Sequence, residues 1–175
     1  FMTDNGPQHA RFNGGLRGRK GGVFEGGIRV PCFVRWPAGL KGDRDVAQPA
    51  AHIDVLPTLT AACGVALAPT LKIDGRNLLP LLANKSAAWP ERSLFFQWHR
   101  GDVPEKGRAF MARDAQFKLV QAAGVPEDAK WKPKFELFDM TKDEYEQNDL
   151  AADRPAVVKR LTAEYEKWFD DVTKQ

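Results

Sequence analysis

The sequence predicts an α/β fold in two parts: the end of an α/β domain, then a small antiparallel sheet packed by a C-terminal helix. Three observations predict this. A glycine-rich loop precedes a hydrophobic run near the start, a short helical pattern comes next, and four aromatic-rich runs separated by turns fill the second half. We place the boundary at about residue 90, which gives predicted domains 1–90 and 91–175.

Two segments in the first part of the chain are typical of buried strands. Phe1, Met2 and Thr3 resemble the last residues of a strand whose beginning is missing. The run GIRVPCFVRWP at 27–37 predicts a second strand, which ends at Pro37 because proline cannot continue the ladder.

A helix and a short apolar segment complete the first part. HIDVLPTLTAACG at 52–64 predicts the helix, with Asp54 as the N-cap and Pro57 in the first turn, where a missing N–H costs little. Gly64 is the expected end of this helix. The apolar segment NLLPLL follows at 77–82.

Four runs rich in aromatic and β-branched residues predict the antiparallel sheet: SLFFQWH, GRAFMAR, QFKLVQ and KFELFDM. Asp114 and Ala115 lie where a hairpin turn is expected between the second and third runs. An amphipathic helix from Pro155 to Val172 follows, with Asp153 as its candidate cap. The apolar stripe that we expect to cover the sheet comprises Val157, Leu161, Tyr165, Trp168, Phe169 and Val172.

Composition and charge exclude several classes of partner. The 175 residues are 43% hydrophobic and 28% charged, as in globular proteins, and the net charge of +3 is too small to indicate nucleic-acid binding. No apolar run approaches the roughly 18 residues that a membrane span needs. Cys32 and Cys63 lie in apolar surroundings, so we expect two buried free thiols.

The Asp-Asn-Gly sequence at 4–6 is a candidate calcium site. Asp4 offers a carboxylate and Asn5 an amide oxygen, and Ca²⁺ takes 6–8 oxygen ligands. Neighbouring strand residues point to opposite faces, so both can reach one ion only if the chain bends, as Gly6 and Pro7 allow. The alternative is an ordinary Asn-Gly turn.

The glycine-rich segment LRGRKGGVFEGGIRVP can fold tightly around a site, because glycine allows close backbone approach. Lys20 within it is a fixed positive charge for an anionic oxygen. The alternative is a surface loop with solvated charges. The segment is not a phosphate-binding P-loop, because GxxxxGK[ST] is absent.

Four other residues and one segment are weaker candidates. His9 follows Asn5 by four residues; we expect a solvated loop residue, with a side chain that faces the pocket as the alternative. His52 is expected to be a structural residue. His99 and Arg100, at the end of a predicted strand, are candidates for substrate contact. The acidic segment DMTKDEYEQND lacks the spacing of an EF-hand, so we expect a solvated turn.

These pieces together resemble the type I sulfatases, which are arylsulfatase-like members of the alkaline phosphatase superfamily. The most specific match is Asp-Asn-Gly followed by Lys-x-x-x-x-Glu-Gly-Gly-[Ile/Val]-Arg. HIDVLPTLTAACGV resembles the Asp-x-Leu-Pro-Thr-Leu helix of that family, and FELFDMTKDEYEQNDLA resembles a segment near its C-terminus. The resemblance covers essentially the whole chain.

The resemblance implies an alkaline-phosphatase-like α/β/α sandwich before the small sheet, and a calcium-dependent hydrolase of sulfate monoesters. It assigns calcium ligation to Asp4 and Asn5 and gives Lys20 a catalytic role, contact with the sulfate oxygens. Glu25, Gly26, Gly27 and Arg29 also match the pattern and are expected to serve the architecture of the loop. The implied substrate is a sulfated small molecule or carbohydrate, and the family is compatible with a periplasmic or secreted location.

The chain departs from the family at the nucleophile, a formylglycine made from the cysteine of Cys-x-[Pro/Ala]-x-Arg. Arg35 follows Cys32 one position too early with no proline or alanine between, and no arginine follows Cys63. We therefore expect the nucleophile and the remaining calcium ligands upstream of Phe1. The chain is then the C-terminal portion of a sulfatase, its partner is the upstream half, and alone it is inactive.

Two alternatives to a sulfatase stay open at this point. A related phosphoesterase or phosphonate hydrolase would carry a serine or threonine nucleophile upstream in place of the cysteine. A non-catalytic module would keep the shape of the loop and work only in binding.

Overall fold

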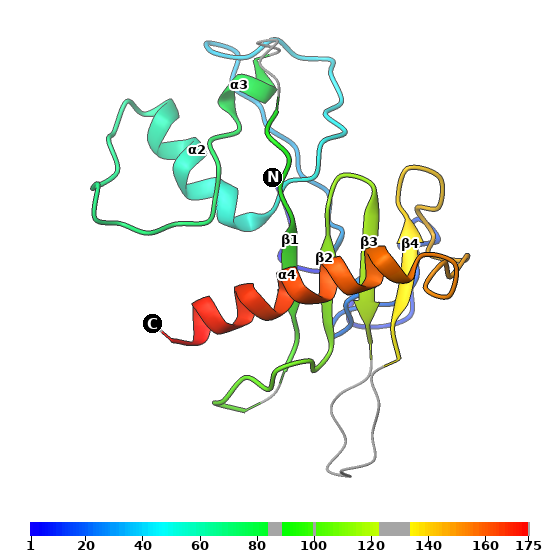
Figure 1. Cartoon of the computed structure of the whole chain (residues 1–175). Coiled ribbons are helices and arrows are strands. Elements are labelled where there is room, and N and C mark those ends of the chain that lie inside the picture. Colours follow the sequence, from blue (N-terminus) through cyan, green and yellow to red (C-terminus); the bar gives the residue numbers. More distant parts are fainter. Residues whose placement is uncertain (84–88, 100, 123–133, 175) are drawn as a thin grey trace. The chain divides into compact units, whose positions relative to one another are not determined.

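The computed structural model describes residues 1–83, 89–99, 101–122 and 134–174 (Figure 1). The chain forms two compact units that alternate along the sequence. The helical unit contains residues 1–4 and 32–91, and the sheet unit contains residues 5–31 and 92–175. Among the described residues, no helix is both long and apolar enough to cross a membrane. The predicted domain boundary near residue 90 stays a prediction.

Three short helices lie in the described part of the helical unit. They are η1 (His52–Asp54), α2 (Val55–Ala62) and α3 (Leu79–Leu82). The predicted helix at 52–64 is confirmed, and Gly64 follows its end with a φ of 67°, a left-handed conformation that favours glycine.

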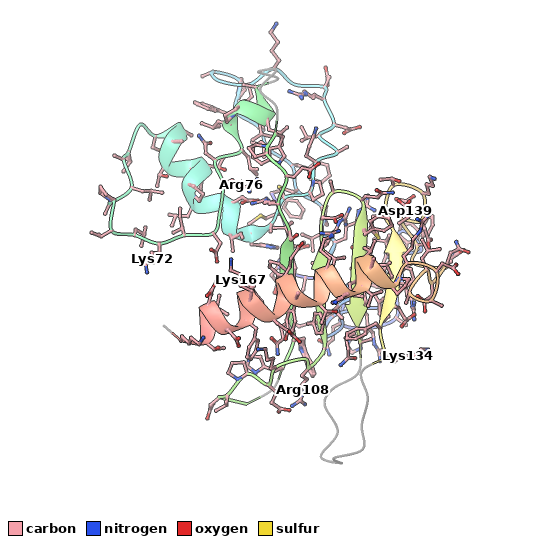
Figure 2. The ribbon with its side chains drawn as sticks, in the orientation of Figure 1. Lys72, Arg76, Arg108, Lys134, Asp139 and Lys167 are labelled. Carbon is pink, nitrogen blue, oxygen red and sulfur yellow. The ribbon has the colours of Figure 1, made fainter. Side chains whose placement is uncertain are left out.

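Asp54 precedes α2 as predicted, but its buried carboxylate does not cap that helix. Its two oxygens accept hydrogen bonds from the backbone N–H groups of Ala51 and Arg76, each at 2.8 Å. Arg76, labelled in Figure 2, in turn donates to the carbonyl groups of Pro90 and Glu91. Asp54 therefore joins the start of the helix to a distant loop of the same unit.

The prediction of a buried strand at 27–37 is wrong for the described chain. Part of this run belongs to the short helix α1 (Glu25–Ile28), and the rest forms only an isolated antiparallel bridge between Met2 and Cys32. Phe33 is 67% exposed. A hydrophobic run becomes a buried strand only where other strands pair with it, and the described residues supply little beyond that bridge.

The prediction of two buried thiols is also wrong. Cys32 and Cys63 are both free, and both are exposed. Cys32 is exposed because its segment lies at the surface instead of inside a sheet. Cys63 directly follows α2, which exposes Leu56 and Leu59 as well.

All four predicted strands of the sheet unit are confirmed. They are β1 (Leu94–Gln97), β2 (Phe110–Arg113), β3 (Phe117–Gln121) and β4 (Glu136–Asp139). The sheet is antiparallel throughout, in the order β1-β2-β3-β4. The hairpin turn at Asp114 is confirmed as well, because its Oδ1 accepts the N–H groups of Gln116 and Phe117.

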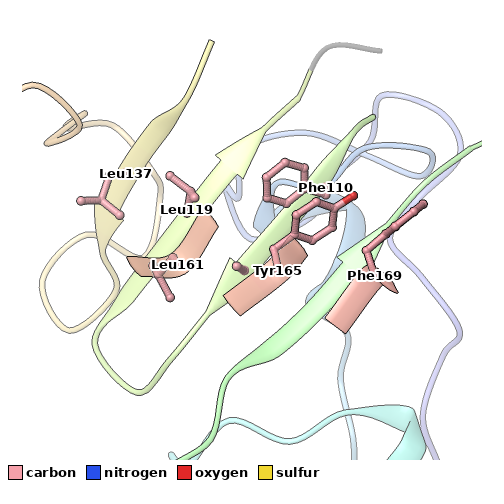
Figure 3. Close-up of a cluster of buried hydrophobic side chains, with 7 residues drawn as sticks. Phe110, Leu119, Leu137, Leu161, Tyr165 and Phe169 are labelled. Carbon is pink, nitrogen blue, oxygen red and sulfur yellow. The ribbon is translucent and has the colours of Figure 1, made fainter. Parts of the chain in front are cut away.

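The helix α4 (Pro155–Thr173) covers one face of this sheet, as predicted (Figure 1). The buried ring of Tyr165 stacks on Phe110 with 3.6 Å between centroids, and its hydroxyl accepts from the Gly107 N–H. Figure 3 shows the cluster that this face buries. Its members are Phe110, Ala112, Leu119, Leu137, Leu161, Tyr165 and Phe169.

Two details of the predicted helix are wrong. The residue that caps α4 is Arg154, and no side chain provides a capping hydrogen bond, so Asp153 does not act as the cap. Val172 is 37% exposed and does not belong to the buried stripe, because the helix there runs beyond the core cluster.

The opposite face of the sheet packs against the glycine-rich segment. Because neighbouring residues of a strand point to opposite faces, Met111 and Val120 point away from α4. They form a second buried cluster with Phe138 and with Val23 of the segment. The sheet is therefore a middle layer, with α4 on one side and the segment that carries Lys20 on the other.

Candidate functional site

Two backbone hydrogen bonds bring the Asp-Asn-Gly turn beside the glycine-rich segment. The N–H of Gly6 donates to the carbonyl of Gly27 at 2.9 Å, and the N–H of Lys20 donates to the carbonyl of Pro7 at 3.1 Å. Of the predicted site residues, Asn5 is half-buried, whereas Asp4 and Lys20 are exposed. The fold thus gathers the backbone on which Asn5 and Lys20 lie into one loop cluster of the sheet unit.

The close approach of these backbones requires glycine. A Cβ atom at Gly6 would overlap the carbonyl oxygen of Gly26. A Cβ atom at Gly27 would overlap the carbonyl oxygens of Arg19 and Gly22, which flank Lys20. The glycines therefore let α1 lie directly against the backbone around Lys20.

Glu25, at the start of α1, is only 2% exposed and lies among cationic groups of the sheet. Its Oε1 accepts a hydrogen bond from the Lys118 Nζ at 2.8 Å, and both of its oxygens lie 3.3 Å from the Arg113 Nη1. This structural role agrees with the expectation that Glu25 serves loop architecture. The ion pair fixes α1 to strands β2 and β3.

Glu146, in the turn after β4, completes what we call the buried ion cluster: Glu25, Arg113, Lys118 and Glu146. Glu146 is 1% exposed, and its Oε2 accepts the backbone N–H of Glu25 at 2.7 Å. Its Oε1 lies 2.7 Å from the Lys118 Nζ, an ion pair outside hydrogen-bond geometry. The expectation that the acidic segment is simply a solvated turn is therefore wrong at Glu146.

The pKa values of the two buried carboxyl groups, Glu25 and Glu146, are shifted in opposite directions. Burial raises the pKa of Glu146, and the Lys118 ammonium offsets only part of that rise. Burial also acts to raise the pKa of Glu25, but Lys118 and Arg113 outweigh it and hold this pKa below the ordinary value. The effect of burial on the pKa is therefore fully offset at Glu25, by Lys118 together with Arg113, and only partly offset at Glu146.

These shifts predict opposite effects of pH on two matched variants. The contribution of Glu25 to stability is present above its ordinary pKa of 4.5 and is lost as pH falls through its lowered value. The contribution of Glu146 is greatest below 4.5 and is lost as pH rises through its raised value. We expect Glu25→Gln to be most destabilising above pH 4.5, whereas Glu146→Gln gains stability relative to the parent as pH rises. Thermal midpoints from about pH 3 to 7 check this, and slopes of the same sign for both variants contradict it.

The remaining candidates have separate places. His9 is exposed. The Nε2 of His52 lies 2.9 Å from the carbonyl oxygen of Thr3, which agrees with the structural role that we expected for His52. His99 lies just past β1, after Trp98, whose ring lies beside Gly21. Arg100 lies outside the described residues.

The donor chemistry at Asp4 and Asn5 suits calcium but is incomplete. A carboxylate and an amide oxygen are both ligands that Ca²⁺ prefers, and two residues supply only part of a set of 6–8 oxygens. Among the described residues, no group of three or more His, Cys, Asp or Glu side chains could hold a metal ion. The residues fit one side of a calcium site.

Sequence reasoning missed Lys118 and Glu146. Lys118 lies within the apolar run FKLV of β3, and Glu146 lies in a turn rich in charge. A charged residue in the middle of a hydrophobic strand was the signal available for Lys118, because lysine is almost never fully buried without a partner. Glu146 gave no comparable signal.

Comparison with known proteins identifies the family. A family model described as "N-sulphoglucosamine sulphohydrolase, C-terminal" matches residues 19–175, which include Lys20 and the buried ion cluster. The steryl-sulfatase of Mus musculus is 34% identical over an alignment of 169 positions that covers 85% of this chain and 27% of that protein. Arylsulfatase A of Homo sapiens is 39% identical over an alignment of 124 positions that covers 67% of this chain and 23% of that protein.

Solved structures agree in fold. The structure of Ps i-CgsB in complex with k-i-k-neocarrahexaose has a TM-score of 0.78 and 26% identity, covering 96% of this chain and 35% of that one. BT1596, described as a 2-O GAG sulfatase, matches with a TM-score of 0.60 at 23% identity, covering 99% of this chain and 35% of that one. These matches confirm the predicted fold class.

The chain spans about a quarter to a third of the length of these relatives. The family match begins at residue 19, so it leaves Asp4 and Asn5 outside and takes in the segment from Arg19 onward. The match and the shared fold lead to one conclusion, as the sequence motifs predicted. The chain belongs to the sulfatase family, as a C-terminal portion.

Proposed function

We propose that the chain is part of a calcium-dependent sulfatase that hydrolyses sulfate monoesters of a small molecule or carbohydrate. The observation that carries this proposal is the pair of backbone hydrogen bonds that joins the Asp-Asn-Gly turn to the segment of Lys20, in a chain of the sulfatase family. The steryl-sulfatase name of one relative and the carbohydrate complex of another support this choice of substrate class.

Each candidate site residue has a defined part in this proposal. Asp4 and Asn5 would hold calcium through their side-chain oxygens, together with ligands from the upstream half. When bound, the ion polarises the sulfuryl group. The ammonium of Lys20 binds a sulfate oxygen and stabilises the negative charge that builds there during S–O cleavage.

The chain does not supply the nucleophile in this proposal. Cys32 and Cys63 are exposed, but neither lies in the sequence context of the formylglycine motif. A maturation enzyme is therefore expected to leave both as cysteine, with the converted cysteine upstream of Phe1. The chain alone is then inactive, because covalent catalysis needs an activated nucleophile near the sulfur.

Removal of the Asp4 carboxylate tests the calcium site. In the full-length protein, we expect Asp4→Ala to deplete bound calcium, measured by elemental analysis after gel filtration, because an oxygen ligand is lost. We expect the chain alone to bind Ca²⁺ on the order of millimolar or weaker in calorimetry, since most ligands are absent. Asp74→Ala, which changes an exposed aspartate of the same unit, is the matched control and should leave calcium content unchanged.

Three outcomes would contradict parts of the proposal. Micromolar calcium binding by the chain alone would show that its own residues complete the site. Normal calcium content with no turnover of sulfate, phosphate or phosphonate esters by the full-length protein would point to a binding module. Turnover of phosphate or phosphonate esters alone would assign the protein to the related hydrolases.

A further inference from the structure

The backbone on either side of Lys20 rests on α1. The N–H of Gly22 donates to the carbonyl of Arg19 at 3.0 Å, which closes a tight turn around Lys20. Both of these residues present their carbonyl oxygens to Gly27 of α1, with no room for a side chain between them. The position of the Lys20 backbone is therefore set by the position of α1.

A helix as short as α1 does not hold its place by itself. It has four residues, Glu-Gly-Gly-Ile, and both its shortness and its two glycines oppose helix formation. Its anchorage comes from the buried ion cluster: the Glu25 carboxylate pairs with Lys118 of β3, and the Glu25 N–H donates to Glu146. Lys118 and Glu146 have fully buried side chains, so water cannot replace these contacts cheaply.

A second contact holds the preceding arm of the segment. Arg17 pairs with Glu136 of β4 at 2.8 Å and donates to the backbone carbonyl of Glu146 at 3.2 Å. Its guanidinium lies over the ring of Phe24, 3.8 Å from the centroid. The segment with Lys20 is thus tied to the sheet on both sides.

Glu146 adopts an unusual backbone conformation while it makes these contacts. Its φ of 58° lies in the left-handed region, which costs free energy for a residue other than glycine. The surrounding contacts over-determine this conformation, as is common where strain serves a function. The turn after β4 therefore holds its carboxylate in one fixed direction, toward α1.

We propose that Glu25, Lys118 and Glu146 are positioning residues for Lys20: the C-terminal sheet holds the sulfate-binding lysine in its working place through the buried ion cluster. This inference rests on the proposed function, because it takes Lys20 as the group that contacts sulfate. The strands of the sheet unit and the turn after β4 then contribute to catalysis, although Glu25, Lys118 and Glu146 need not touch the substrate.

A double-mutant cycle in the full-length protein tests the inference, with turnover of nitrophenyl sulfate as the readout. The variants are Glu25→Gln, Lys20→Ala and their combination. We expect Glu25→Gln to lower kcat/KM by about 10- to 100-fold, the scale for misplacing a catalytic group by about 1 Å. In the Lys20→Ala background, the same change should lower it no further, because the lysine that Glu25 positions is already absent.

Three further variants separate positioning from a general loss of structure. Glu146→Gln keeps an oxygen that can accept the Glu25 N–H, so we expect it to retain activity within about threefold, whereas Glu146→Ala loses about tenfold. Leu161→Ala is the structural control, because it weakens the α4 face of the sheet and does not touch the cluster. Its effect should be the same with Lys20 present or absent.

The results distinguish the two proposals. Full additivity of Glu25→Gln and Lys20→Ala, or equal losses for Glu146→Gln and Glu146→Ala, would overturn the positioning role and leave the proposed function intact. Near-normal turnover of Lys20→Ala itself would overturn the catalytic role of the lysine and the positioning role that rests on it, while hydrolysis of sulfate esters by the protein would stand. If Glu25→Gln does not fold, the two Glu146 variants in the same cycle carry the test alone.

Discussion

Replacing Lys20 by alanine in the full-length protein is expected to lower kcat on a sulfate ester by about 10²–10³, the scale for losing one preorganised charge at a transition state. The ammonium stabilises charge on a sulfate oxygen as the ester bond breaks, and water in its place offers no oriented positive charge. The side chain is exposed, so its removal should leave the thermal midpoint nearly unchanged. Nitrophenol release and thermal unfolding, measured side by side, check both halves of the expectation.

A neighbouring cation provides the matched control for this change. Arg19 precedes Lys20 in the same segment and is also exposed. We expect Arg19→Ala to change kcat by less than about threefold, since a general loss of positive charge at the surface is screened by salt. Similar losses for both variants would assign the effect to the charge of the loop and not to Lys20. A fully active Lys20→Ala protein would reduce the lysine to a solvated residue.

Lys118→Met is expected to destabilise the sheet unit by about 3–5 kcal/mol, the cost of breaking a buried ion pair by removing one partner. Methionine fills a similar volume, so the loss is electrostatic: the buried carboxylates of Glu25 and Glu146 lose their shared ammonium. Native-state hydrogen exchange of the β3 amides measures the opening free energy of this sheet directly.

A neutralised cluster is the control for Lys118→Met. The triple variant Glu25→Gln, Lys118→Met, Glu146→Gln removes the charge at all three positions, and the Arg113 guanidinium, which loses its carboxylate partner, is 21% exposed and keeps contact with water. We expect the triple variant to recover much of the lost stability, since a buried ion pair replaced by uncharged groups of similar size is often close to neutral. A loss below about 1 kcal/mol for Lys118→Met alone would show that the cluster does not anchor the sheet unit.

The sequence predicted the sheet and α4 correctly because their signals are local. Each strand is a short apolar run that contains at least one phenylalanine and is bounded by turn residues, and the apolar stripe of α4 repeats at helical spacing. The segment 27–37 shows where such signals end. Its hydrophobic run is compatible with a central strand, but that state depends on neighbouring strands, and the described chain gives Cys32 only a bridge to Met2.

The residues of the candidate site also differ in whether a local sequence signal marks them. Asp4, Asn5 and Lys20 were found from short motifs whose residue types suit a cation and an anion. Lys118 and Glu146 could not be found so, because the contacts of Glu25 with them span 93 and 121 positions. Their pairing is decided by how the sheet folds, and a charged residue in a turn looks the same in sequence whether it is solvated or buried.

The alternation of the two units along the chain has a consequence for inheritance. A recombination joint at residue 91 would carry the strands and α4 but leave behind residues 5–31. The apolar face of Met111, Val120 and Phe138 would then lack its cover, and Lys118 would lack Glu25. Exchange of the sheet unit between related genes would therefore have to move residues 5–31 and 92–175 together. We expect the two segments to share one evolutionary history.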